Sequence, residues 1–154
     1  MNAPAGVVQI RLMTASDLPR VIEIAQTLKE VPRWPLEAWL TALDPAASPR
    51  RIALVADHPP TGVIDGFAVA ALLPPLAELE TIAVAAEARR QGVGSCLIAA
   101  LLGELRQSEI SEVSLEVRAS NHPAHAFYPA LGIAKTGCRA RYHADPIEAA
   151  LLMT

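Results

Sequence analysis

Residues 89–95 are the stretch whose residue types and spacing are best suited to chemistry, reading Arg-Arg-Gln-Gly-Val-Gly-Ser. An apolar run with helical spacing follows at once, so the glycines stand at the start of a predicted helix. The first backbone N–H groups of a helix lack partners within it, and the helix dipole adds partial positive charge there. Gly92 and Gly94 would let an anion approach these amides closely, and Arg89 and Arg90 add positive charge. The glycines alone suit phosphate binding and an ordinary strand-to-helix turn equally well.

Two well-known phosphate-binding motifs do not fit this stretch. A P-loop has lysine before its Ser or Thr, whereas here Ser95 follows Gly94 directly. A dinucleotide-binding turn needs a third glycine, whose place Leu97 takes, and an acidic residue at the end of the next strand. Glu112 and Glu116 lie near the required distance, but only one strand–helix–strand unit can be drawn. Both motifs are therefore excluded.

The chain before this stretch contains two predicted helices among four predicted strands. Apolar residues at helical spacing predict a helix over 14–30, with Thr14 or Ser16 as its N-cap. Prolines on either side delimit a short second helix over 36–43. Alternating or continuously apolar runs bounded by turn residues predict the strands, which are 7–14, 51–57, 63–75 and 78–84.

The chain after the glycines continues the alternation of helices and strands. A stripe of leucine and isoleucine predicts a helix over 93–107, and Cys96 within this run is expected in the core. Strict alternation predicts a strand over 111–119, and a helix from Ser120 or Asn121 to about 131 should follow. A strand pair over 133–142 and 147–153 completes a mixed α/β domain.

Length and composition bound the class of protein. The 154 residues suit one domain, 1–154, and a hydrophobic content of 52% predicts a globular fold. The net charge of −3 and the lack of a basic block argue against direct nucleic-acid binding. No apolar run approaches the roughly 18 residues of a membrane span, and the N-terminus lacks a signal-peptide pattern. We therefore expect a cytoplasmic protein that does not bind membranes.

Metal binding is not expected. Cys96 and Cys138 are far apart and match no zinc-site spacing. His122 and His125 are three residues apart, but no third ligand is apparent and Pro123 lies between them.

The glycine stretch and its surroundings together resemble one enzyme family. R-R-Q-G-V-G is similar to the (Q/R)-x-x-G-x-(G/A) pattern of the GNAT acetyltransferases, in the expected place between a strand and a helix. Further segments resemble the branch that acetylates the N-terminal amine of a ribosomal protein, namely 78–84, 115–121, 126–133 and the tail 139–153. The resemblance implies an α/β (α+β) GNAT fold with a mixed, mostly antiparallel central sheet. Helices would cover both faces, and two strands would splay around the coenzyme site.

The resemblance also implies acetyl-CoA as cosubstrate. The backbone of Ile82, Ala83 and Val84 would bind the pantetheine arm as an added strand does. Asn121 matches an asparagine that contacts the cofactor in the family. The pyrophosphate would lie on the backbone amides of the turn, and the arginines would add positive charge beside it. The residues of this site are Arg89, Arg90, Gln91, Gly92, Val93, Gly94 and Ser95.

Glu116 and Tyr128 match the general base and general acid of the family. The chemistry requires such a pair, because an ammonium cannot attack a thioester and the departing thiolate needs a proton. A solvated strand carboxylate is the alternative for Glu116, and a core aromatic is the alternative for Tyr128. Pro129 departs from the family pattern, since proline disfavours continuation of the helix. Either the helix ends at Tyr128 or the tyrosine is shifted.

The acceptor is expected to be a primary amine, in particular a protein N-terminus. An α-amine with a pKa of about 8 is roughly a tenth deprotonated near neutral pH, whereas lysine at about 10.4 is under a thousandth. Trp34, Trp39 and Tyr142 lie in segments that border the acceptor site in the family, with core or lid packing as the alternative for the tryptophans. A small-molecule amine acceptor and a non-catalytic acetyl-CoA-binding module stay open, as does a homodimer.

Overall fold

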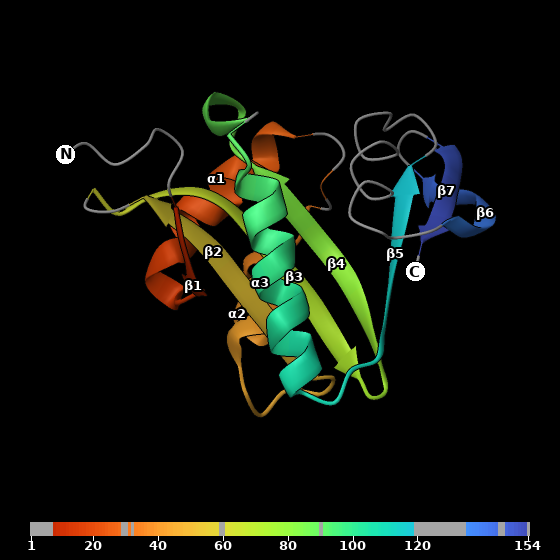
Figure 1. Cartoon of the computed structure of the whole chain (residues 1–154). Coiled ribbons are helices and arrows are strands. Elements are labelled where there is room, and N and C mark those ends of the chain that lie inside the picture. The colour runs from red at the N-terminus through yellow and green to blue at the C-terminus, as the bar shows by residue number, and fades with distance from the viewer. Residues whose placement is uncertain are drawn as a thin grey trace.

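Seven strands form one sheet in the order β1-β2-β3-β4-β5-β7-β6 (Figure 1). The computed structural model describes residues 8–28, 31, 33–58, 61–89, 91–118, 135–144 and 147–153. Every neighbouring pair of strands is antiparallel except β4 and β5, which run parallel, so the expected mixed, mostly antiparallel sheet is confirmed. The strands are β1 (Gln9–Leu12), β2 (Arg51–His58), β3 (Val63–Leu73), β4 (Leu76–Val84), β5 (Glu112–Arg118), β6 (Lys135–Ala144) and β7 (Ile147–Met153).

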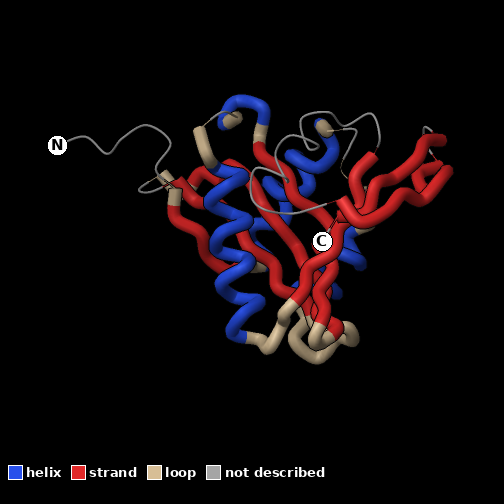
Figure 2. Tube along the Cα trace, turned by 45° about the vertical axis from the view of Figure 1, so that its right-hand side comes forward, coloured by secondary structure: helices blue, strands red, loops and turns tan. Residues whose placement is uncertain are grey.

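Helices cover both faces of this sheet (Figures 1 and 2). The neighbouring residues Gly66 and Phe67 of β3 show the two sides, because consecutive strand residues face opposite ways. A Cβ on Gly66 would lie 3.2 Å from Leu97 of α3, whereas the Phe67 ring lies 5.4 Å from that of Trp39 in α2. The expected arrangement is confirmed for α1 (Leu18–Thr27) and α2 (Leu36–Leu43) on one face and α3 (Val93–Gln107) on the other.

The central strand β3 shows why the sheet needs both layers. Its residues 64–72 are all buried, an unbroken run that is typical of a strand covered on two sides. On α3, the side chains of Leu97, Leu101 and Leu105 are at most 1% exposed, which confirms the predicted apolar stripe. Cys96, however, is exposed. The prediction that it is a core residue was wrong, because its position turns it away from the face that carries Leu97 and Leu101.

The predicted boundaries hold best where a stop signal is strong. The helices predicted over 36–43 and 93–107 have these bounds in the structure. The helix predicted over 14–30 is shorter, with a 3-10 turn at Ala15–Asp17 followed by α1, which ends at Thr27. The helix predicted to about 131 lies outside the described residues. Among the described helices, none is long and apolar enough to cross a membrane.

A polar cluster fixes the entry to α1. Thr14, one of the two predicted choices, is the N-cap of the 3-10 turn that precedes α1, whose own N-cap is Asp17. The Thr14 amide donates to the Asp17 carboxylate at 2.8 Å. Arg11 of β1 donates to both oxygens of that carboxylate, at 2.8 and 2.9 Å. These bonds, led by those of Arg11, hold the pKa of the buried Asp17 below its usual range. The charged cluster therefore joins the first strand to the first helix.

Gly66 allows the close approach of β3, β4 and α3, and this makes a prediction about stability. A Cβ at this position would lie 2.7 Å from the backbone oxygen of Ala83, which cannot rotate away as a side chain can. Gly66→Ala should lower the free energy of unfolding by about 1–3 kcal/mol, measured by urea denaturation.

The matched control is Gly103→Ala on α3, where a Cβ would meet nothing within 4 Å. Glycine is a poor helix residue, so this change should raise the free energy of unfolding by about 0.5–1 kcal/mol. Equal effects of the two substitutions would contradict the steric account of Gly66.

Candidate functional site

The parallel strands β4 and β5 separate halfway along their length. Their pairing runs from Leu76 with Glu112 to Leu79 with Leu115 and ends there within the described residues. Beyond this point β4 continues to Val84 on β3, whereas β5 pairs with β7 on its other side. Figure 1 shows the two strands running apart, which confirms the expected splay. The β4 edge at residues 82–84 therefore faces a gap between the strands.

A β-bulge in β4 lies at the same level. In the ladder with β3, Thr81 is opposite Val69 and Leu79 is opposite Ala70, so Glu80 is the extra residue. A bulge bends and twists the strand that carries it, and it occurs here where β4 leaves β5. The buried hydroxyl of Thr81 next to it has no hydrogen-bond partner in the described part of the chain. The bulge thus coincides with the opening of the gap.

The N-terminus of α3 follows this edge closely in the chain. Gly92 is the N-cap and has φ +78°, a left-handed conformation that favours glycine. Its carbonyl accepts the first bond of the helix, from the amide of Cys96 at 3.0 Å. Val93 is 1% exposed and anchors the helix start in the core. The first-turn amides, which include Gly94 and Ser95, form the type of site that binds anions.

The segment between β4 and this turn is attached to distant parts of the chain. Arg20 of α1 donates to the carbonyl of Ile64 at 3.1 Å and to Glu87 at 2.7 Å. The Ala85 amide donates to the carbonyl of Asp65 at 2.7 Å. The pKa of Glu87 is lowered, first by its own backbone amide and then by Arg20. Sequence reasoning missed this support, since neither spacing nor residue type links Arg20 to a segment so far away.

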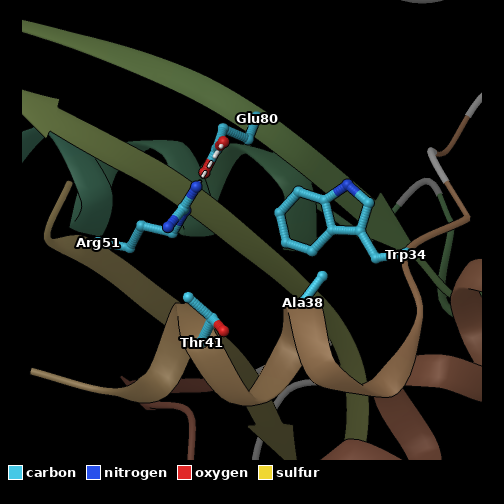
Figure 3. A pocket seen from close by; sticks show the side chains of 5 residues that line it. All are labelled: Trp34, Ala38, Thr41, Arg51 and Glu80. Atoms are coloured by element: carbon cyan, nitrogen blue, oxygen red, sulfur yellow. Dashed lines mark hydrogen bonds and ion pairs between the residues drawn. The ribbon is translucent and has the colours of Figure 1, made fainter. Parts of the chain in front are cut away.

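A cavity of about 280 Å³ opens on the α2 face of the sheet. Figure 3 shows an ion pair on one side of it and an indole ring on the other. The Arg51 Nε donates to the Glu80 Oε1 at 2.6 Å, and a terminal nitrogen donates to Oε2 at 3.3 Å. Their side chains are only 18% and 20% exposed. The cavity is lined by Trp34, Ala38, Thr41, Arg51 and Glu80.

The two tryptophans of the predicted acceptor segment have different places. Trp34 lines the cavity, whereas Trp39 is 1% exposed and belongs to the core. Their rings lie 4.7 Å apart at 49°, and Trp39 meets Phe67 edge-on at 86°. Trp39 is therefore a core residue, as the alternative prediction had it, and its ring packs against that of Trp34. Arg51 and Glu80 were missed by sequence reasoning, because each lies in an ordinary strand pattern.

The structure describes some of the remaining predicted site residues. Gln91 and Ser95 are exposed beside the turn, as is Arg89. Glu116 lies on β5, one residue beyond the last residue paired with β4, and Tyr142 lies on β6. Three further predicted site residues, Arg90, Asn121 and Tyr128, lie outside the described part of the chain, as do His122, His125 and Pro129.

The described residues fit an elongated ligand such as acetyl-CoA. A strand edge that has left its neighbour offers backbone groups to an extended amide chain. The same strand leads through one short turn to the helix N-terminus at Gly92, which suits a pyrophosphate. The two features are consecutive in the sequence, and the support from Arg20 holds the segment between them.

The sequence of this chain is similar to those of known acetyltransferases. The sequence model described as the acetyltransferase (GNAT) family matches residues 18–133. The ribosomal protein bS18-alanine N-acetyltransferase of Escherichia coli is 36% identical over 94 residues, covering 60% of this chain and 64% of the relative. An N-alpha-acetyltransferase of Saccharolobus solfataricus is 35% identical over 91 residues, covering 56% and 54%. The matched segment thus spans about half to just under two thirds of these curated relatives.

A solved structure extends the likeness to nearly the whole chain. The crystal structure of the ribosomal-protein-S18-alanine N-acetyltransferase from Escherichia coli superposes with a TM-score of 0.81. It is 29% identical, and the match covers 96% of this chain and 92% of that one. The two proteins therefore share their fold along nearly the whole chain.

The left-handed conformation of Gly92 makes a prediction about ligand binding. Gly92→Ala should cost about 1–2 kcal/mol of stability, because an L-residue is strained at this φ. The substitution should also displace the first-turn amides of α3, which are expected to hold the pyrophosphate. Coenzyme A binding, measured by calorimetry, should therefore weaken about tenfold.

Gly62 in the β2–β3 turn is the matched control, with φ +73° and, like Gly92, nothing within 4 Å of an added Cβ. Gly62→Ala should cost similar stability and leave coenzyme A binding unchanged. Equal loss of binding in both variants would show that the effect arises from general destabilisation.

Proposed function

Because the chain belongs to the acetyltransferase (GNAT) family, we propose that it transfers an acetyl group from acetyl-CoA to the N-terminal α-amine of a protein. The single observation that carries the proposal is the separation of β4 from β5, in the strand that leads to the helix N-terminus at Gly92. This places an open strand edge and an anion site in line, as a long nucleotide thioester requires. Transfer is direct, with both substrates bound together.

The cosubstrate is held by backbone groups more than by side chains. Ile82, Ala83 and Val84 bind the pantetheine arm along the β4 edge, in the manner of an added strand. The amides from Arg90 to Ser95 hold the pyrophosphate, with Arg89 beside them and Asn121 as a further contact. When bound, acetyl-CoA supplies an acetyl thioester. A backbone site of this kind holds its geometry because the core fixes β4 and α3.

Glu116 and Tyr128 move the protons. Glu116 accepts a proton from the acceptor ammonium, directly or through a water, so that the amine has a free lone pair. Tyr128 donates a proton to the departing thiolate. The position of Glu116 supports its role, because its backbone lies where β5 has just left β4. An α-amine suits a single carboxylate base better than a lysine does, since it loses its proton more readily.

The acceptor approaches from the α2 side, near Trp34 and Tyr142. The names of the relatives support a protein N-terminus, since they are a ribosomal protein alanine N-acetyltransferase and an N-alpha-acetyltransferase. A ribosomal or similar newly made protein would be met in the cytoplasm, which is the location that we propose.

A thiol-release assay with acetyl-CoA and peptides of varied N-terminus tests the catalytic pair. Glu116→Gln and Tyr128→Phe should each lower turnover by about a hundredfold or more, as expected for loss of a general base or acid. Glu112→Gln, on the same strand, is the matched control and should leave turnover near the wild-type value.

Two other outcomes would redirect the proposal. Unchanged turnover in both variants would show that this pair does not carry the protons. If no peptide or small amine releases thiol while coenzyme A still raises the melting temperature, the protein is a binding module. Release with small amines alone would assign a small-molecule acceptor.

A further inference from the structure

The cavity on the α2 face lies beside the point at which β4 leaves β5. Glu80, one of its walls, is the bulged residue that directly follows the last residue of β4 paired with β5. Strand residues advance about 3.3 Å each, so Glu80 lies about 7 Å along β4 from Ile82. Ala38 and Thr41 of α2 line the cavity, whereas α3 lies on the opposite face of the sheet. An acceptor that enters from the α2 side therefore passes this cavity.

The charges in this cavity are already matched to each other. Both oxygens of the Glu80 carboxylate accept from Arg51, and a further Arg51 nitrogen donates to the carbonyl of Pro49 at 3.4 Å. The pair carries no net charge and is largely shielded from water. The opposite wall is the indole of Trp34 with the methyl group of Ala38 (Figure 3).

We propose that this cavity receives the side chain of the acceptor's first residue and that the Arg51–Glu80 ion pair makes it select an uncharged one. The inference rests on the proposed function, since it concerns the acceptor of that reaction. The first side chain is attached to the carbon that carries the reacting amine, so it lies within reach of Glu80 when the amine is at the gap.

Desolvation explains the selection. A charged side chain that enters the cavity loses water, yet the group of opposite charge there is already paired. It must then disrupt the Arg51–Glu80 bonds or remain without a partner. An uncharged side chain loses little and gains contact with the ring of Trp34. The ion pair thus disfavours both positively and negatively charged first side chains. The specificity arises because the wrong side chains bind poorly.

Removing either member of the ion pair should favour peptides whose first residue has the same sign of charge as the residue removed. Arg51→Met leaves the Glu80 carboxylate available, so a peptide that begins with Arg should gain relative to one that begins with Met. Glu80→Gln leaves the Arg51 guanidinium available, so a peptide that begins with Glu should gain instead. Each ratio of kcat/KM should change by about tenfold or more, as expected for a hydrogen bond to a charged group.

The experiment uses the full chain, acetyl-CoA and three peptides that differ only in a first residue of Met, Glu or Arg. Wild type should prefer Met over both charged residues, and the double variant Arg51→Met with Glu80→Gln should do so again. Asp57→Asn is the matched control, because Asp57 is paired with Arg11 at the far end of β2. Its side chain is 19% exposed, a fraction similar to the 20% of Glu80. Melting curves establish that each variant is folded, and either single variant is sufficient for the test.

The outcomes separate this inference from the proposed function. If wild type acetylates none of these peptides and no other peptide, the proposed function fails and the inference fails with it. If wild type acetylates peptides but the single variants show the same ratios as Asp57→Asn, only the inference is overturned. A wild-type preference for a charged first residue would also overturn it.

Discussion

The site depends on one constraint, which is that β4 does not stay paired with both of its neighbours along its whole length. It pairs with β3 to its end but with β5 only as far as Leu79. The bulge at Glu80 occurs at this same point and bends the strand. Backbone groups that would otherwise complete the sheet are thereby directed into the gap. Within the described residues, a central strand thus acquires an unpaired edge inside the sheet.

Under the proposed function, the two faces of the sheet would take different substrates. On one face, α3 uses buried side chains such as Val93 and Leu97 to fix its position, so that its first amides are held in place. On the other face, α2 packs Trp39 against Phe67 and presents Trp34 to the cavity. The core between them, centred on β3, fixes the two faces relative to each other. The proposed direct transfer would need such rigidity, because both substrates must be held in one geometry.

Charged pairs connect parts of the chain that hydrophobic packing alone would leave adjustable. Arg20 joins α1 to β3 and to the segment before the glycine turn, and Arg51 joins β2 to the bulge in β4. The exposed pair between Arg20 and Glu87 contributes little net stability. The effect of these pairs is on geometry, because each one limits where a neighbouring segment can lie.

The sequence by itself determined the fold class, most elements and the glycine turn at the start of α3. Local signals are enough for these features, since alternation predicts strands, prolines delimit α2, and glycine spacing marks the start of α3. The chemistry assigned to Glu116 and Tyr128 also came from the sequence, through its resemblance to a family. Only the tertiary structure decided that Cys96 is exposed, that Trp39 is core while Trp34 lines a cavity, and that Gly66 is required by its neighbours. It also brought Arg51 to Glu80 across β3. The physical reason is that these properties depend on which strands lie side by side and where a bulge shifts their register, and no local pattern encodes either.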